Sequence, residues 1–258
     1  MRCWPISTAA RPVLRQSESQ KTAGIDGSEA LTGTQGKKLR HLRQSLVCLI
    51  PAMGLAGAAQ ADGPRHSARD PGCTQVATVQ YLDCQLEQIF TCPPIEGESQ
   101  PVTRTEGYDA LGLRDVSLDT YDGATIEYTS IGLGYYVQTT PAQRKSTSRE
   151  DMLAKGSWFS SNDRTVVVNG VAGRGHRALR SDDTGDTTQI SGLTFRVFHA
   201  RTRRSYPQPF GMADLTFREY VSETPFLDLA GEASDSSADP SRQPHRPMAV
   251  ALPKDPGF

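Results

Sequence analysis

Residues 82–92 read LDCQLEQIFTC, and the alternation within this stretch decides the fold class. Leu82, Leu86 and Phe90 share the even positions with Cys84 and Cys92, whereas most of the odd positions are polar. Because successive side chains of a strand point to opposite faces, this period of two predicts a β-strand with one apolar face. A helix is the alternative interpretation, since apolar residues also recur at helical spacing in this region: Val76, Val79, Leu82, Leu86 and Ile89.

Other stretches of the chain are similarly rich in β-branched and aromatic residues. We expect further strands at 114–120, 124–137, 157–160, 165–169, 177–180, 194–200 and 214–221, with hairpin turns at 161–163 and 182–186. One short helix is expected between Ser148, which can cap its first turn, and Gly156, which can end it. Together these elements predict a mostly β fold, a small antiparallel β-sandwich or barrel-like domain with one short helix.

The stretch KKLRHLRQSLVCLIPAMGLAGAAQADG, which begins at Lys37, has the three parts of a secretory signal peptide. A basic region precedes a mostly apolar run at 45–59, and Ala59 and Ala61 supply the small residues at a cleavage site. The run is shorter than the roughly 20 residues that span a bilayer, so we expect no transmembrane anchor. This pattern predicts an exported protein, periplasmic or secreted, with a signal peptide at 37–61.

The rest of the chain divides by composition into four parts. We expect 1–36 to be a disordered leader or a start-site artefact, 62–72 a polar linker, 73–229 the β-rich domain and 230–258 a flexible, disordered tail. The last residues, 248–258, regain apolar character and could instead dock as an edge strand. Residues 62–258 hold 20 Lys and Arg against 26 Asp and Glu, a balance that argues against nucleic acid as a partner.

Three cysteines follow the expected cleavage site, and in an oxidising compartment they are disulfide candidates: Cys73, Cys84 and Cys92. If 82–92 is one straight strand, Cys84 and Cys92 lie about 26 Å apart, whereas the Cα atoms of a disulfide lie about 5.5 Å apart. Cys73 should therefore pair with one of them and leave the other as a buried thiol. The cysteine spacings do not match structural zinc sites, and Asp119 and Asp122 do not match a calcium loop, so we expect no metal.

The most suggestive motif is VVVNGVAGRGHR at 166–177, where a strand-like run leads into a glycine-rich stretch. Such a stretch can bind phosphate on its backbone N–H groups, but no long helix follows it, so a turn or bulge is the preferred interpretation. Arginines cluster here and further along the chain, and could bind an anion if the two segments converge: Arg174, Arg177, Arg201, Arg203 and Arg204. Otherwise they are solvated surface side chains.

No catalytic motif is present: the sequence lacks G-x-S-x-G, H-E-x-x-H, S-x-x-K and C-x-x-C, and it indicates no cofactor. His199 shares the parity of Phe195 and Val197, so we expect it in the core. The activity stays unknown at this point, and elimination favours a non-enzymatic envelope or secreted binding module with a protein or small-ligand partner. The alternative is a hydrolase-type enzyme whose site assembles from distant loops. His176 or His199 bonded to both a Ser or Thr and an Asp would favour the enzyme, and an apolar barrel mouth or groove would favour binding.

Overall fold

The computed structural model describes residues 68–207, 211–233, 245–255 and 258. The expected leader, the signal peptide and part of the linker and tail lie outside these residues. The strands are β1 (Thr74–Tyr81), β2 (Leu86–Cys92), β3 (Val102–Asp109), β4 (Gly112–Asp119), β5 (Thr125–Ser130), β6 (Tyr135–Gln138), β7 (Arg144–Ser146), β8 (Ser157–Val168), β9 (Val171–Ile190), β10 (Leu193–Ser205), β11 (Met212–Glu223), β12 (Phe226–Ala233) and β13 (Pro247–Ala251). The helices are η1 (Pro141–Gln143), a 3₁₀ turn, and α1 (Arg149–Lys155).

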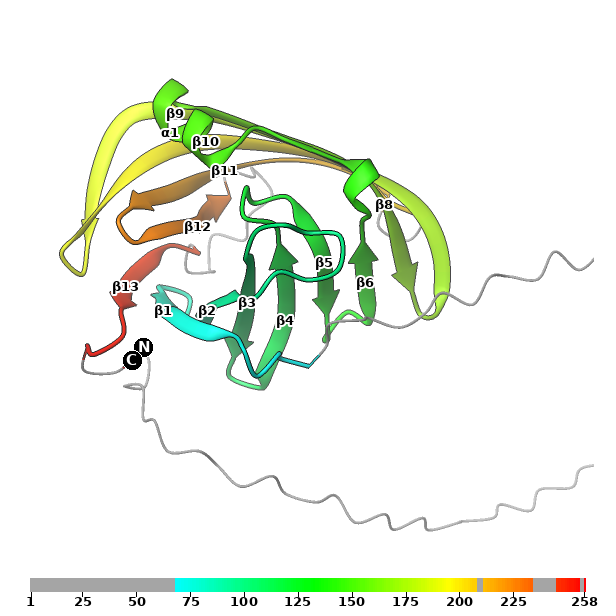
Figure 1. Ribbon diagram of the computed structural model, residues 1–258, viewed down its shortest axis with the longest axis horizontal. Coiled ribbons are helices and arrows are strands. Elements are labelled where there is room, and N and C mark those ends of the chain that lie inside the picture. The colour runs from blue at the N-terminus through cyan, green and yellow to red at the C-terminus, as the bar shows by residue number, and fades with distance from the viewer. Residues whose placement is uncertain (1–67, 208–210, 234–244, 256–257) are drawn as a thin grey trace, which may run out of the picture. The chain divides into compact units, whose positions relative to one another are not determined.

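All thirteen strands belong to one antiparallel sheet, which confirms the mostly β prediction and favours its barrel-like form. The hydrogen-bonded order is β12-β11-β10-β9-β8-β6-β5-β4-β3-β2-β1-β13, with β7 paired to β8. The long strands β9–β11 arch across the shorter strands β2–β6 (Figure 1). The two ends of the sheet, β12 and β13, approach each other without pairing, so the sheet is nearly closed.

The sheet also extends beyond residue 229, where the flexible tail was expected to begin. Strand β12 runs to Ala233, and β13 pairs with β1. This agrees with the alternative expectation that the last residues of the chain dock as an edge strand. The side-chain oxygen of Ser191 accepts a hydrogen bond of 3.0 Å from the backbone N–H of Val250. The tip of the β9–β10 hairpin thereby holds β13 on its unpaired side. Across the ranges given above, no helix has the length and hydrophobicity needed to cross a membrane.

Several strand boundaries differ from the prediction because polar residues lie inside this sheet. Residues 161–163, expected to form a turn, lie within β8, and Asn162 is only 2% exposed. The β8–β9 turn falls instead at Asn169 and Gly170, both of which have positive φ, as a tight two-residue hairpin requires. Residues 182–186 likewise continue β9, and 131–134 divide the expected strand at 124–137 into β5 and β6.

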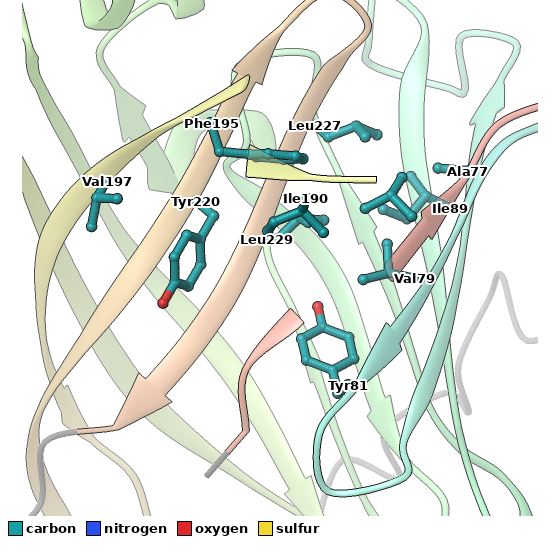
Figure 2. Close-up of a cluster of buried hydrophobic side chains, with 11 residues drawn as sticks. Ala77, Val79, Tyr81, Ile89, Ile190, Phe195, Val197, Tyr220, Leu227 and Leu229 are labelled. Carbon is teal, nitrogen blue, oxygen red and sulfur yellow. The ribbon is translucent and has the colours of Figure 1, made fainter. Parts of the chain in front are cut away.

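The largest apolar cluster joins the first strands of the sheet to its last ones. Figure 2 shows Ala77, Val79 and Ile89 from β1 and β2 opposite Leu227 and Leu229 from β12. Members of this cluster include fully buried side chains such as Phe195 of β10. Burial of apolar surface is the main favourable term in folding, so this cluster holds the curved sheet together where β12 and β13 do not pair.

The first described residues cover the outer face of β2 and β3. The guanidinium of Arg69 lies 3.9 Å from the centroid of the Phe90 ring and forms an ion pair with Glu106, which is buried. Cys73 is joined to Cys92 by a disulfide, which fixes this segment to the end of β2. The prediction that Cys73 pairs with one of the other two cysteines is therefore confirmed.

The prediction of one strand across 82–92 is wrong in its first part. Residues 82–85 form the β1–β2 turn, and β2 begins at Leu86. Cys84 lies exposed in this turn with φ of 65°, so the expected buried thiol on an apolar face is wrong as well. The turn requires a residue with left-handed backbone conformation at this point. The alternation of polar and apolar residues does not reveal such a requirement.

Replacing both Cys73 and Cys92 with Ser should lower the free energy of unfolding by roughly 2 to 3 kcal/mol. The bond closes a loop with a sequence separation of 19, and without it the unfolded chain gains conformational freedom. Urea denaturation of the oxidised wild type and of the double variant measures the difference. Equal midpoints for the two proteins would contradict this role of the disulfide.

The single α-helix lies where the sequence predicts it. The Ser148 side chain accepts a hydrogen bond of 3.1 Å from the backbone N–H of Asp151, and Gly156 ends the helix in the left-handed conformation. Met152 faces inward and packs in a cluster with Trp158 and Phe198. This cluster places α1 against the inner face of β8.

Candidate functional site

A cavity of about 550 Å³ lies inside the barrel-like sheet. Residues from β1 to β6, from β8 to β12 and from α1 form its wall, so most of the sheet contributes to it. Part of the wall is apolar, including Trp158, Leu179 and Phe217. The unusual feature is the number of carboxyl and guanidinium groups in it: Glu87, Asp119, Asp122, Arg149, Arg164, Arg177, Arg204, Glu219 and Asp228.

Two arginines project from neighbouring strands of this wall. Arg164 on β8 is opposite Gly175, and Arg177 on β9 is opposite Asn162, so the two side chains are diagonal neighbours on the same face. Arg164 donates to the Asn162 carboxamide oxygen at 2.8 Å and to the Tyr206 hydroxyl at 2.9 Å. Arg177 donates to the hydroxyls of Thr202, at 3.2 Å, and Thr125, at 3.4 Å. Burial lowers the pKa of Arg164 to about 10, which still leaves it charged at neutral pH.

Three carboxyl groups lie on other parts of the wall, and burial raises the pKa of each. Glu219 on β11, which accepts a hydrogen bond from Ser181, has a pKa raised to about 8 by burial and by the charge of Asp228. The pKa of Asp228 on β12 is raised to about 6 by burial and by Asp119. The pKa of Asp119, which accepts a hydrogen bond of 2.7 Å from Ser117, is raised by burial. Burial and their mutual repulsion therefore favour a shared proton on the Glu219 and Asp228 pair at neutral pH.

Protein atoms surround Asp228, but its carboxyl group points into the cavity. Its side chain therefore stays accessible to solvent or to a ligand there. Among the residues placed in the structure, none forms a hydrogen bond or an ion pair with its carboxyl group. Glu87 lies elsewhere on the wall and accepts a hydrogen bond of 2.6 Å from the Tyr81 hydroxyl. The wall thus contains carboxyl groups with a hydrogen-bond partner, such as Glu87, and one without a described partner, Asp228.

Helix α1 and the β4–β5 turn form another part of the wall. The backbone N–H of Arg149 donates to the Asp122 carboxylate at 3.0 Å, and its guanidinium donates to the carbonyl oxygen of Tyr121. The same guanidinium lies 3.6 Å from the centroid of the Phe226 ring and 3.9 Å from that of Tyr121. Its Nε atom is buried and has no hydrogen-bond partner in the described parts of the chain.

The glycine-rich stretch at 166–177 serves close packing at this site. A Cβ atom on Gly173 would lie 2.4 Å from Cγ of Pro207, and one on Gly175 would lie 3.1 Å from the Tyr206 ring. Both glycines are therefore needed where residues 206 and 207 cross β9. The stretch forms the β8–β9 hairpin, with its turn at Asn169 and Gly170.

The five arginines predicted to bind an anion do not share one face. Arg177 and Arg204 line the cavity. Arg174, Arg201 and Arg203 are exposed on the other face of β9 and β10. Arg201 forms an ion pair of 2.7 Å with Asp214, as a solvated surface side chain often does.

The histidines do not assemble a catalytic arrangement in the described residues. His199 is exposed, so its predicted core position is wrong. The register shifts between Arg196 and Phe198, and this bulge reverses the parity of the strand after Phe195. His176 pairs with Asp163 at 2.8 Å on an exposed surface, and no Ser or Thr hydrogen-bonds to either histidine among the residues described.

Sequence reasoning missed most of the cavity residues, including Arg164, Asp119, Glu219 and Asp228. One signal was available: Glu219 shares the parity of Phe217, and a charged residue on the apolar parity of a strand indicates a polar interior.

Within the described ranges, no cluster of three or more His, Cys, Asp or Glu side chains could hold a metal ion. No protein-family model matches the chain, and no curated protein or solved structure is significantly similar to it.

Proposed function

We propose that this protein is exported and binds a small molecule in the cavity inside its barrel-like sheet. The observation that carries the proposal is the cavity of about 550 Å³, with both apolar and ionisable groups on its wall. Small-molecule sites are typically clefts or cavities of roughly 300 to 1,000 Å³ with a few directed polar groups. The buried Nε of Arg149 and the accessible carboxyl of Asp228 are polar groups that a ligand could satisfy.

A binding role is supported over a hydrolase by the positions of the ionisable groups. No described histidine lines the cavity. His176 and His199, the two histidines considered for an enzyme site, are exposed on β9 and β10. The disulfide is compatible with export, because such bonds persist in oxidising compartments. Mass analysis of the secreted or periplasmic fraction tests export, and a mature chain that starts before residue 37 would contradict it.

Filling the cavity tests the binding role directly. Ala230 on β12 lines the cavity, so Ala230→Trp should occupy part of the ligand volume. We expect this variant to lower affinity at least tenfold for N-phenylnaphthylamine (NPN), an uncharged dye whose fluorescence rises in apolar surroundings. Ala172→Trp is the matched control, since Ala172 on β9 is exposed and does not line the cavity.

Fluorescence titration with NPN measures both variants beside the wild type. Retained affinity in Ala230→Trp, or equal losses in both variants, would show that the dye binds outside the cavity. Thermal denaturation of each variant distinguishes loss of the site from loss of the fold.

A further inference from the structure

We infer that Arg164 and Arg177 form a subsite for the oxyanion of a small organic acid, so that the cavity prefers an anionic ligand to a neutral one of the same shape. This inference rests on the proposed binding function and specifies the class of ligand. Its evidence is the way in which the two guanidinium groups are held.

The first observation is that both guanidinium groups have only neutral hydrogen-bond partners. Asn162 and Tyr206 hold Arg164, and two threonines hold Arg177. Neither arginine forms an ion pair within the described part of the chain. Arg164 is buried and Arg177 is half-buried. Buried charges are normally paired, so two neighbouring cations without a directly bonded anion indicate that the anion is brought by a ligand.

The second observation is that hydrogen-bond donors remain available on a rigid support. A guanidinium has five N–H donors, and the two bonds of Arg177 leave donors unused on its terminal nitrogens. Arg164 is only 4% exposed, and its bonds to Asn162 and Tyr206 fix its orientation. Fixed guanidinium groups match the geometry of carboxylate, sulfonate and phosphate oxygens.

The carboxyl groups of the wall do not cancel this preference. Asp119 interacts electrostatically with both arginines, and Glu219 and Asp228 interact with Arg177. Among the residues described, none of the three carboxyl groups makes an ion pair with either arginine. Burial raises the pKa of Glu219, so at neutral pH this group can donate a hydrogen bond instead of repelling an anion. Asp228 is the group that would favour a cationic ligand, and the experiment below includes that outcome.

Two dyes with the same ring system test the subsite. Anilinonaphthalene sulfonate (ANS) carries one sulfonate, and NPN is its uncharged counterpart. We expect Arg177→Gln to weaken ANS binding by roughly ten- to a hundredfold, the range for a lost charge-assisted hydrogen bond, and to change NPN binding less than twofold. Arg177→Lys should retain most of the ANS affinity, because it keeps the charge.

Arg203→Gln is the matched control, since Arg203 lies on the exposed face of β10 and should change the affinity for neither dye. If NPN binds and Arg177→Gln leaves ANS affinity unchanged, or strengthens it, the oxyanion subsite is wrong while the binding function stands. Equal losses for both dyes would also overturn the subsite, because they indicate altered shape and not lost charge. If neither dye binds the wild type, the proposed function fails and the inference fails with it.

Discussion

Replacing Glu106 with Gln should lower the free energy of unfolding at pH 7 by roughly 4 kcal/mol, the usual cost of breaking a buried ion pair. Glu106 is 4% exposed on the outer face of β3 and accepts hydrogen bonds from Arg104 at 2.8 Å and Tyr108 at 2.7 Å, besides Arg69. A carboxamide offers one acceptor oxygen where the carboxylate offers two, and it removes the negative charge that Arg69 and buried Arg104 face.

The pH dependence of this effect has a definite sign. Burial alone would raise the pKa of Glu106, but hydrogen bonds from Arg69, Tyr108 and Arg104 outweigh it and lower the pKa to about 2. A lowered pKa stabilises the folded state above the unfolded value of 4.5, and that contribution is lost as the pH falls towards 2. The difference between wild type and Glu106→Gln should therefore shrink between pH 5 and pH 2.

Urea denaturation at pH 7 and at pH 3 measures both parts of this prediction. Asp182→Asn is the control, because its ion pair with Arg180 is exposed and should contribute nothing measurable. A Glu106→Gln variant as stable as the wild type at pH 7 would show that the three donors do not depend on the charge.

Part of the strand set was predictable from sequence, because alternation and β-branched residues identify half-buried strands where one face is apolar. The strands β1, β3, β7 and β12 lie outside the predicted ranges. The helix at 149–155 was predictable for another local reason, since Ser148 and Gly156 act within one turn of each end. Boundaries were missed where the interior is polar. Asn162 indicates a turn on composition alone, yet it lies in β8 and accepts a hydrogen bond from Arg164 inside the sheet.

The candidate site was mostly not predictable, because its residues meet only when the sheet curls. Asp119, Arg177 and Asp228 lie on β4, β9 and β12, and no local pattern relates their positions in the chain. A single bulge at Val197 was enough to move His199 from the expected core to the surface. Register shifts of this kind depend on pairing between distant strands, so a period of two cannot locate them.

Replacing Glu219 with Gln should stabilise the protein at pH 8 by up to about 4 kcal/mol and change its stability little at pH 4.5. Burial and the charge of Asp228 raise the pKa of Glu219 to about 8 from an unfolded value of 4.5. The folded state then binds more protons than the unfolded state between these values, so stability falls as the pH rises through this window. Gln resembles the protonated acid, keeps an acceptor for the Ser181 hydroxyl and carries no ionisation cost.

Thermal unfolding between pH 4.5 and pH 8 compares wild type with Glu219→Gln and with Glu223→Gln, an exposed position on the same strand. The wild type and Glu223→Gln should both lose stability towards pH 8, whereas Glu219→Gln should lose less.

If the Glu219→Gln variant instead follows the wild-type curve at lower stability throughout, the wild-type Glu219 carboxylate is paired in the folded state. The cavity would then hold an internal ion pair where the structure shows only the Ser181 hydroxyl bonded to Glu219. A ligand acid would face a fixed negative charge there, which makes this measurement a check on the oxyanion subsite as well.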